Sequence, residues 1–101
     1  MEYINRIELQ GTVGTVRSNV IGTSPVQNFS LATEFCYRHS DGNPIVETTW
    51  HQIVAWNQKA VQKGDSVRVV GRIRQTKYVG SDGTQKILSE VVASELEIIK
   101  E

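Results

Sequence analysis

The chain is built from short segments in which apolar and polar residues alternate, separated by turns that contain glycine. Alternation with a period of two is typical of strands that bury one face. Such segments run over Arg6–Val13, Val26–Tyr37, Ile45–Asn57, Ser66–Gln75 and Lys86–Ile99. The turns Ser40–Pro44 and Gly80–Gly83 each contain Asp-Gly, which readily takes the positive φ angles of tight turns. The pattern therefore predicts about five strands and two tight hairpins.

The connections between the other segments are less uniform. Arg17–Pro25 is rich in Ser, Asn, Gly and Pro and is predicted to be a loop. Asn57–Lys63 is the only helix candidate, about two turns at most, and it is stopped by Gly64. Gly11 and Gly14 indicate a bend or the close approach of another backbone.

The alternation also predicts which side chains face the core. In the fourth segment the inward residues are Val67, Val69, Gly71 and Ile73, and the outward residues are Arg68, Val70, Arg72 and Arg74. In the last segment the expected core residues are Ile87, Val91, Ala93, Leu96 and Ile98.

Length and composition limit the classes of protein that remain. The chain has 101 residues, and we expect a single domain over residues 1–101 with one core. The formal net charge is zero, so any role with nucleic acid has to depend on local charge. The single cysteine excludes an intramolecular disulfide, and no metal-ligand cluster or cofactor motif is present. No signal peptide or long apolar run is visible, so we expect a cytoplasmic protein.

Many short strands in one small domain indicate a sandwich or a barrel. A five-stranded Greek-key barrel with a helix between its third and fourth strands is the OB-fold, and the predicted elements occur in that order. An SH3-like barrel is the alternative, but it usually lacks the long third strand and the helix that follows. We therefore expect an all-β, five-stranded OB-fold barrel.

Both tryptophans lie in Thr48–Asn57, a stretch rich in β-branched and aromatic residues. Because successive side chains on a strand point to opposite faces, the even-numbered residues from Trp50 to Trp56 share one face. If that face is open, its two flat rings form a platform on which nucleobases can stack. Spacing alone equally allows the reverse arrangement, with both rings in the core.

Four segments resemble the bacterial single-stranded DNA-binding protein family. They are Gly11–Gly14, Asn28–Thr33, Glu47–Trp56 and Gly64–Arg74, which are similar to the family's first four strands in order. Within the third, the pair Trp50-His51 followed by apolar residues and an aromatic is a specific signal. The resemblance extends over nearly the whole chain.

In that family DNA wraps over OB domains and its bases stack on aromatic side chains. Carried over position by position, the stacking residues fall on Tyr37, Trp50, Trp56 and Tyr78. Trp56 stands where a phenylalanine is common, which preserves an aromatic ring. Gln52, a further DNA-binding candidate, stands where the family often has a basic residue, so one phosphate contact is expected to be missing. The resemblance thus favours an open aromatic face.

Cationic side chains lie close to these aromatics in the sequence. Arg72 and Arg74 are on the outward face of the fourth segment, Lys77 and Lys86 flank the second hairpin, and Arg17 and Arg38 lie in or beside loops. Such cations can follow a phosphate backbone while the aromatics hold the bases. An ordinary solvated surface is the alternative. The acidic residues gather towards the C-terminus, which leaves the middle of the chain relatively basic.

The leading function is therefore sequence-independent single-stranded DNA binding in replication, repair or recombination. We expect no enzymatic activity, because no acid/base pair or nucleophile is placed for catalysis, and His51 is assigned a packing role. An OB adaptor of replication restart, resembling primosomal replication protein N, is the first alternative. The third hypothesis is that the protein is an enzyme or an oligosaccharide-binding OB module.

The resemblance also implies partners and a location. We expect a homo-oligomer, a tetramer rather than a dimer, and a nucleoid-associated protein. The polar outward residues Glu8, Gln10 and Thr12 suit pairing through the first strand. The family's flexible linker and acidic, Phe-ended tail do not follow Ser94–Glu101, which alternates like a closing strand. We expect DNA binding to need no tail, and replication or repair proteins not to be recruited by that route.

Overall fold

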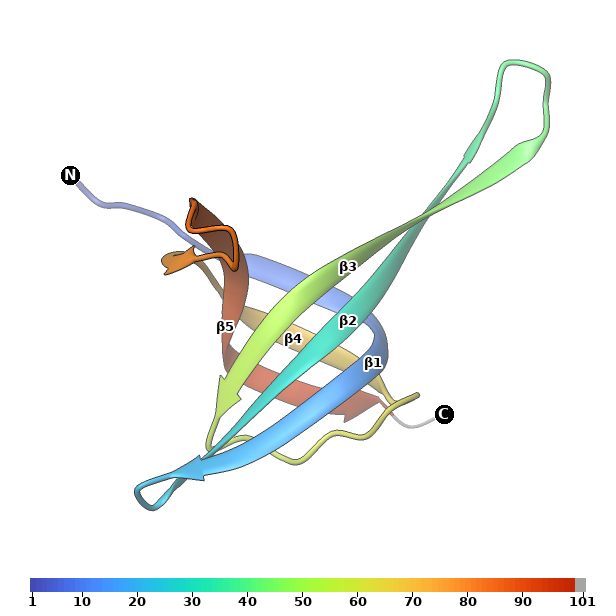
Figure 1. Ribbon diagram of the computed structural model, residues 1–101. Coiled ribbons are helices and arrows are strands. Elements are labelled where there is room, and N and C mark those ends of the chain that lie inside the picture. The colour runs from blue at the N-terminus through green and yellow to red at the C-terminus, as the bar shows by residue number, and fades with distance from the viewer. Residues whose placement is uncertain (100–101) are drawn as a thin grey trace.

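The protein is an all-β barrel, as the sequence predicts, in a computed structural model that describes residues 1–99 (Figure 1). Lys100 and Glu101, at the end of the predicted closing segment, lie outside the described residues. The strands are β1 (Ile7–Ile21), β2 (Ser24–Arg38), β3 (Pro44–Trp56), β4 (Ser66–Val79) and β5 (Gln85–Ile99). They close in the order β1-β2-β3-β5-β4.

The barrel closes because β1 changes partner along its length. Its first part pairs with β4 and its second part with β2, and both ladders meet at Thr12. A Cβ atom on Gly11 would lie 2.0 Å from the carbonyl oxygen of Ala32, so only glycine allows the two strands to approach this closely. The predicted close approach at Gly11 is confirmed. The barrel's one parallel ladder among residues 1–99 joins β3 to β5 over Ile53–Ala55 and Val91–Ala93.

The core follows the predicted alternation within the barrel. Its members include Val13, Phe29, Leu31, Ile53, Ala55, Val67, Val69, Val91 and Ala93. Along β5 the inward set then changes from Val91 and Ala93 to Leu96 and Ile98, which pack against this cluster. A register shift produces the change, because Ala93 pairs with Gly71 and Glu95 with Val70, which leaves Ser94 as a bulge.

Two predicted core residues are not in the core. Ile73 is 46% exposed and Ile87 is 60% exposed. Ile87 continues the alternation of β5 but pairs with Lys77 on the part of the β4–β5 hairpin that extends past the core. The period of two identifies a face of a strand, and it does not show where along the strand the barrel interior ends.

The prediction of a loop over Arg17–Pro25 is also wrong. β1 continues to Ile21 and β2 begins at Ser24, so that the connection is a tight turn with Gly22 at a φ of 64°. The Asp-Gly hairpins are confirmed, since Gly42 and Gly83 have φ angles of 88° and 83°.

The predicted helix Asn57–Lys63 is absent, and no helix occurs anywhere in residues 1–99. Instead the buried side chain of Gln27 makes two of the backbone hydrogen bonds of this segment. Its Nε2 donates to the carbonyl of Lys59 at 2.5 Å, and its Oε1 accepts from the amide of Val61 at 3.0 Å. Val61 is 5% exposed and joins the core. The segment closes one end of the barrel as an extended plug because a tertiary contact replaces helical bonds.

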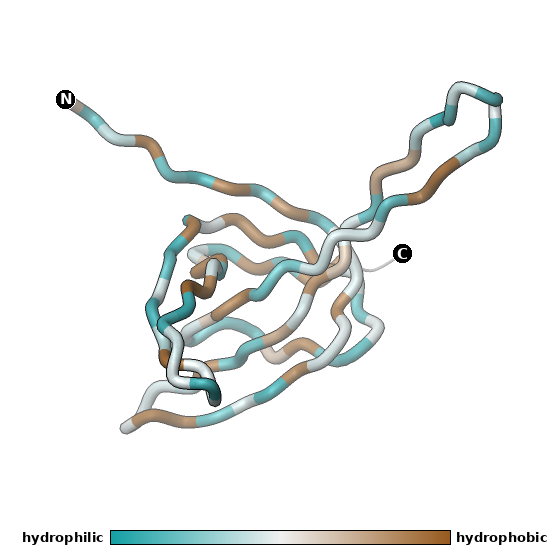
Figure 2. The backbone as a smooth tube through the Cα atoms, turned by 45° about the horizontal axis from the view of Figure 1, so that its top comes forward, coloured by the Kyte–Doolittle hydropathy of each residue, from teal (hydrophilic) through white to brown (hydrophobic). Residues whose placement is uncertain are grey.

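The paired strands β2 and β3 continue past the barrel as a long projecting hairpin (Figure 1). We call residues 34–48 the β2–β3 arm. Figure 2 shows apolar stretches along this hairpin as well as in the barrel wall. Phe35, Tyr37 and Val46 are exposed on it.

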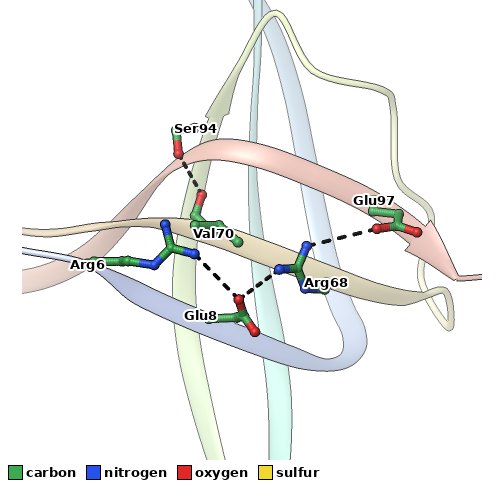
Figure 3. A network of polar contacts seen from close by, with 6 residues as sticks. All are labelled: Arg6, Glu8, Arg68, Val70, Ser94 and Glu97. Carbon is green, nitrogen blue, oxygen red and sulfur yellow. Dashed lines mark hydrogen bonds and ion pairs between the residues drawn. The ribbon is translucent and has the colours of Figure 1, made fainter.

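An ion-pair network lies on the outer face of β1, β4 and β5 (Figure 3). Arg68 contacts Glu8 at 2.7 Å and Glu97 at 4.0 Å, and Arg6 contacts Glu8 at 3.7 Å. Val70 was predicted to point outward, but it is only 3% exposed. It lies between this network and Ser94, and the Ser94 hydroxyl donates to the Val70 carbonyl at 3.0 Å. Charged side chains and a bulge therefore cover an apolar residue on the outer side of the barrel.

Candidate nucleic-acid interface

Both tryptophans lie on the outer face of β3. Trp50 pairs with Ala32 and Trp56 with Val26, while the alternate residues Ile53 and Ala55 point into the core. Trp50 is 57% exposed and Trp56 is 37% exposed. Of the two arrangements that spacing allowed, the structure has the one with the rings outside.

The Trp50 ring extends across β2 to β1. A Cβ atom on Gly14 would lie 2.6 Å from Trp50 Cζ3 and 2.6 Å from Ser30 Oγ, so the indole lies directly on the glycine. A register shift between Val13 and Val16 makes room there, and the amide of Thr15 donates to Ser30 Oγ at 2.9 Å. One side of the ring is thus supported by the barrel and the rest is exposed, which is the geometry of a stacking platform.

One cavity of about 230 Å³ lies at this ring and is lined by Ile7, Trp50, His51, Gln52, Ile73, Ser89, Glu90 and Val91. Two more lie on the outer face of β1, β2 and β3, one lined by Trp50 itself and the other by the neighbouring residues Ser30 and Gln52. The larger, of about 570 Å³, is lined by Gln10, Gly11, Thr12, Val13, Ala32, Glu34, Thr48 and Trp50. The smaller, of about 360 Å³, is lined by Thr15, Arg17, Asn28, Phe29, Ser30 and Gln52. We call the smaller one the Arg17 groove. Gln52 therefore lies beside Trp50, as predicted, in company with an arginine that the sequence placed in a loop.

A second set of predicted residues gathers on the β4–β5 hairpin. Tyr78 pairs with Lys86, and both share the outer face with Arg72 and Arg74. A Cβ atom on Gly80 would lie 2.9 Å from Lys86 Cε, so the lysine side chain passes close over the turn. Lys77 pairs with Ile87 and is on the opposite face. The structure therefore brings Tyr78 and Lys86 together and separates them from Lys77.

Arg72 and Arg74 differ in their partners. Arg74 donates to Glu90 Oε1 from Nε at 3.0 Å and also from Nη2, and the Glu90 side chain is 10% exposed. Within residues 1–99 no carboxylate lies within ion-pair distance of Arg72. Arg72 can meet a phosphate directly, whereas Arg74 has to exchange a carboxylate that is already bound.

Tyr37 is separated from the tryptophans. It pairs with Ile45 on the β2–β3 arm, on the face of the ribbon that continues the barrel interior, whereas Trp50 is on the other face. Its nearest aromatic neighbour is Phe35, with ring centroids 6.0 Å apart and ring planes inclined by 32°. The four predicted stacking residues thus form three separate groups: Trp50 with Trp56, Tyr78, and Tyr37.

His51 and Asp82 each have a hydrogen-bond partner within the chain. His51 Nε2 lies 2.8 Å from Thr33 Oγ1, across β2 and β3. Hydrogen bonds from Thr84 hold the pKa of Asp82 below its usual value of 3.8 at the second hairpin turn. In residues 1–99 no group of three His, Cys, Asp or Glu side chains is arranged to hold a metal ion, and no helix is long and apolar enough to span a membrane.

A model of the single-strand binding protein family matches residues 4–99. The chain belongs to this family. It is 30% identical to the single-stranded DNA-binding protein of Xanthomonas axonopodis pv. citri and 31% identical to that of Neisseria meningitidis serogroup A, in each case over 95% of the chain. The alignments cover 58% and 60% of those proteins, so the chain spans less than two thirds of their length.

Solved structures agree with the family assignment. The Plasmodium falciparum SSB in complex with single-stranded DNA superimposes with a TM-score of 0.85 and 28% identity, over 99% of this chain and 98% of that one. The small single-stranded DNA-binding protein of Streptomyces coelicolor superimposes with a TM-score of 0.73 over 98% of this chain and 96% of that one, at 21% identity, and supports the fold alone. Both structures thus share the fold of this barrel.

Proposed function

We propose that this protein binds single-stranded DNA without sequence preference, in replication, repair or recombination. The observation that carries the proposal is the pair Trp50 and Trp56, exposed on one outer face of the barrel with the Arg17 groove beside them. Every base has a π-face, so stacking on such rings is tolerant of sequence. A family member of 28% identity has been solved with single-stranded DNA, which supports the same ligand here.

The roles of the site residues follow from their chemistry. Trp50 and Trp56 stack on bases, and Tyr78 on the β4–β5 hairpin adds a third aromatic. Arg72, Lys77 and Lys86 contact phosphates, and Arg74 does so in competition with Glu90. Gln52 supplies an amide to the sugar-phosphate backbone beside Trp50. Tyr37 stacks separately, on the arm. No catalytic step is part of this function.

The test is a titration of intrinsic tryptophan fluorescence with oligo-dT, oligo-dA and oligo-dC. We expect quenching by all three homopolymers and binding that weakens as salt rises, because phosphate contacts release counterions. Fluorescence that no single strand changes would contradict the proposal, as would binding confined to one sequence. The two exposed tryptophans favour DNA binding itself over the replication-restart adaptor considered from the sequence.

We further propose that the protein self-associates, a tetramer rather than a dimer, through the outer face of β1. One OB domain covers only about 4–16 nucleotides, so wrapping a longer strand needs several copies. Gln10 and Thr12 are exposed there, and Glu8 already holds two arginines in its own chain, which favours polar pairing. Light scattering at micromolar concentration tests this, and a monomer would contradict it.

Replication and repair proteins are proposed as further partners in a nucleoid-associated, cytoplasmic setting.

A further inference from the structure

The two cavities beside Trp50 on the outer face of β1, β2 and β3 differ in charge, and the third cavity at this ring contains Glu90 and no Lys or Arg among its lining residues. The Arg17 groove contains one cation and the polar side chains of Thr15, Asn28, Ser30 and Gln52, and no carboxylate. The larger cavity contains Glu34 and no cation among its lining residues. A phosphate group is attracted to the first and repelled by the second.

The Arg17 groove also lies between the two tryptophans. Ser30 pairs with Gln52, and Arg17 pairs with Asn28, which pairs with Val54. The groove residues are therefore level with positions 52 and 54 of β3, while the rings are at Trp50 and Trp56. Trp56 lies six positions after Trp50 along the strand, about 20 Å at the usual rise per residue. A strand that stacks on both rings has to carry its backbone across this interval.

Arg17 itself is available for a ligand. It is exposed on the outer face, and within residues 1–99 no carboxylate lies within ion-pair distance of it. Arg68 and Arg74, in contrast, are held by Glu8 and Glu90. The arm beyond Glu34 is unfavourable for a phosphate backbone, because residues 34–48 contain Glu34, Asp41 and Glu47 against Arg38.

We infer that Arg17 is a phosphate-binding residue, and that the DNA strand runs along the outer face of β3 from Trp50 to Trp56 through the Arg17 groove. This inference rests on the proposed function and specifies the path within it. The amide and hydroxyl groups of Gln52, Asn28 and Ser30 supply neutral hydrogen-bond partners to the sugar-phosphate backbone on the same path. The aromatic pair holds the bases, and the groove between them holds the linking phosphate.

The experiment measures oligo-dT affinity at several salt concentrations for wild type, Arg17→Gln, Arg17→Lys and Lys63→Gln. One lost phosphate contact makes the negative slope of log K against log salt shallower by about 0.7. At 0.1 M salt this change weakens binding about five-fold. We expect this change for Arg17→Gln and a restored slope for Arg17→Lys. Lys63 is exposed and is not among the residues that line the groove, so Lys63→Gln should match wild type. Equal slopes for Arg17→Gln and wild type, or equal losses for Arg17→Gln and Lys63→Gln, overturn the inference.

Glu34→Gln provides the second arm, because it removes the carboxylate of the larger cavity. We expect an unchanged salt slope, since the phosphate does not pass there. An increase in affinity comparable to the loss in Arg17→Gln places the backbone in the larger cavity and overturns the path. If wild type fails to bind any single strand, the proposed function itself fails. If wild type binds and Trp50→Ala weakens binding while Arg17→Gln does not, only this inference fails.

Discussion

Gly14 on β1 and Trp50 on β3 lie so close together that a methyl group on the glycine would be 2.6 Å from Trp50 Cζ3. Real Cβ atoms do not approach a neighbour this closely, so the indole occupies the volume that any other residue would need. The platform for bases therefore depends on a residue that lies two strands away and contributes no side chain.

Gly14→Ala should displace the Trp50 ring without unfolding the protein, because the atoms it meets belong to the side chains of Trp50 and Ser30. We expect oligo-dT binding to weaken by up to the value of one stacking interaction, about 1–3 kcal/mol. In a Trp50→Ala background the same change should cost much less, because only the contact with the Ser30 hydroxyl then remains. A double-mutant cycle measures this coupling. Equal losses in both backgrounds would show that Gly14 acts independently of the ring.

Gln27 should be the main polar determinant of stability. It is 5% exposed and satisfies both Val61 and Lys59 in the plug. Gln27→Met keeps the size of the side chain and removes its hydrogen bonds, so we expect the free energy of unfolding to fall by about 1–3 kcal/mol. Urea denaturation measures the change, with Gln62→Met, on the exposed surface of the same segment, as the control. Similar losses in the two variants would contradict the assigned role.

The sequence predicts which face of a strand a side chain occupies, because that depends on one strand alone. It does not predict which residues of two strands lie side by side, because that depends on the register between them. Trp50, Gln52 and Trp56 could be assigned to one face because the period of two acts within β3. The separation of Tyr37 from Trp50 depends on the register of the β2–β3 ladder, and the Arg74–Glu90 pair depends on that of β4–β5. The helix expected at Asn57–Lys63 is absent for the same reason, because Gln27, distant in sequence, bonds the backbone of Lys59 and Val61. Arg17 was placed in a loop because Ser, Asn and Gly obscure the alternation of a strand that pairing with β2 extends.

Arg72 and Arg74 should contribute unequally to DNA binding. Arg72→Gln should lower the salt slope by about 0.7, the value of one phosphate contact. Arg74→Gln should lower it less, because Glu90 already holds that guanidinium. Affinity measured across salt concentrations separates the two variants. A larger slope change for Arg74→Gln than for Arg72→Gln would mean that DNA displaces Glu90 readily.

The second hairpin turn should respond to acid. Hydrogen bonds from the Thr84 side chain and backbone lower the pKa of Asp82 below 3.8. The stabilisation is therefore fully present above pH 3.8 and is lost as the pH falls through the lower folded-state value. NMR titration of the Asp82 carboxyl should give a midpoint below 3.8 that rises in Thr84→Val. An unchanged midpoint in that variant would remove the hydroxyl as the cause.

The central claim is that bases stack on Trp50, and the affinity of Trp50→Ala for oligo-dT tests it most directly. Stacking is worth roughly 1–3 kcal/mol per base, so we predict a loss of about one to two orders of magnitude. Trp50→Phe, which keeps an aromatic ring, should recover most of the affinity, and circular dichroism should show an intact barrel for both variants. An intact Trp50→Ala protein that binds oligo-dT as tightly as wild type would contradict the account, and so would a variant that fails to fold, because the ring would then belong to the core.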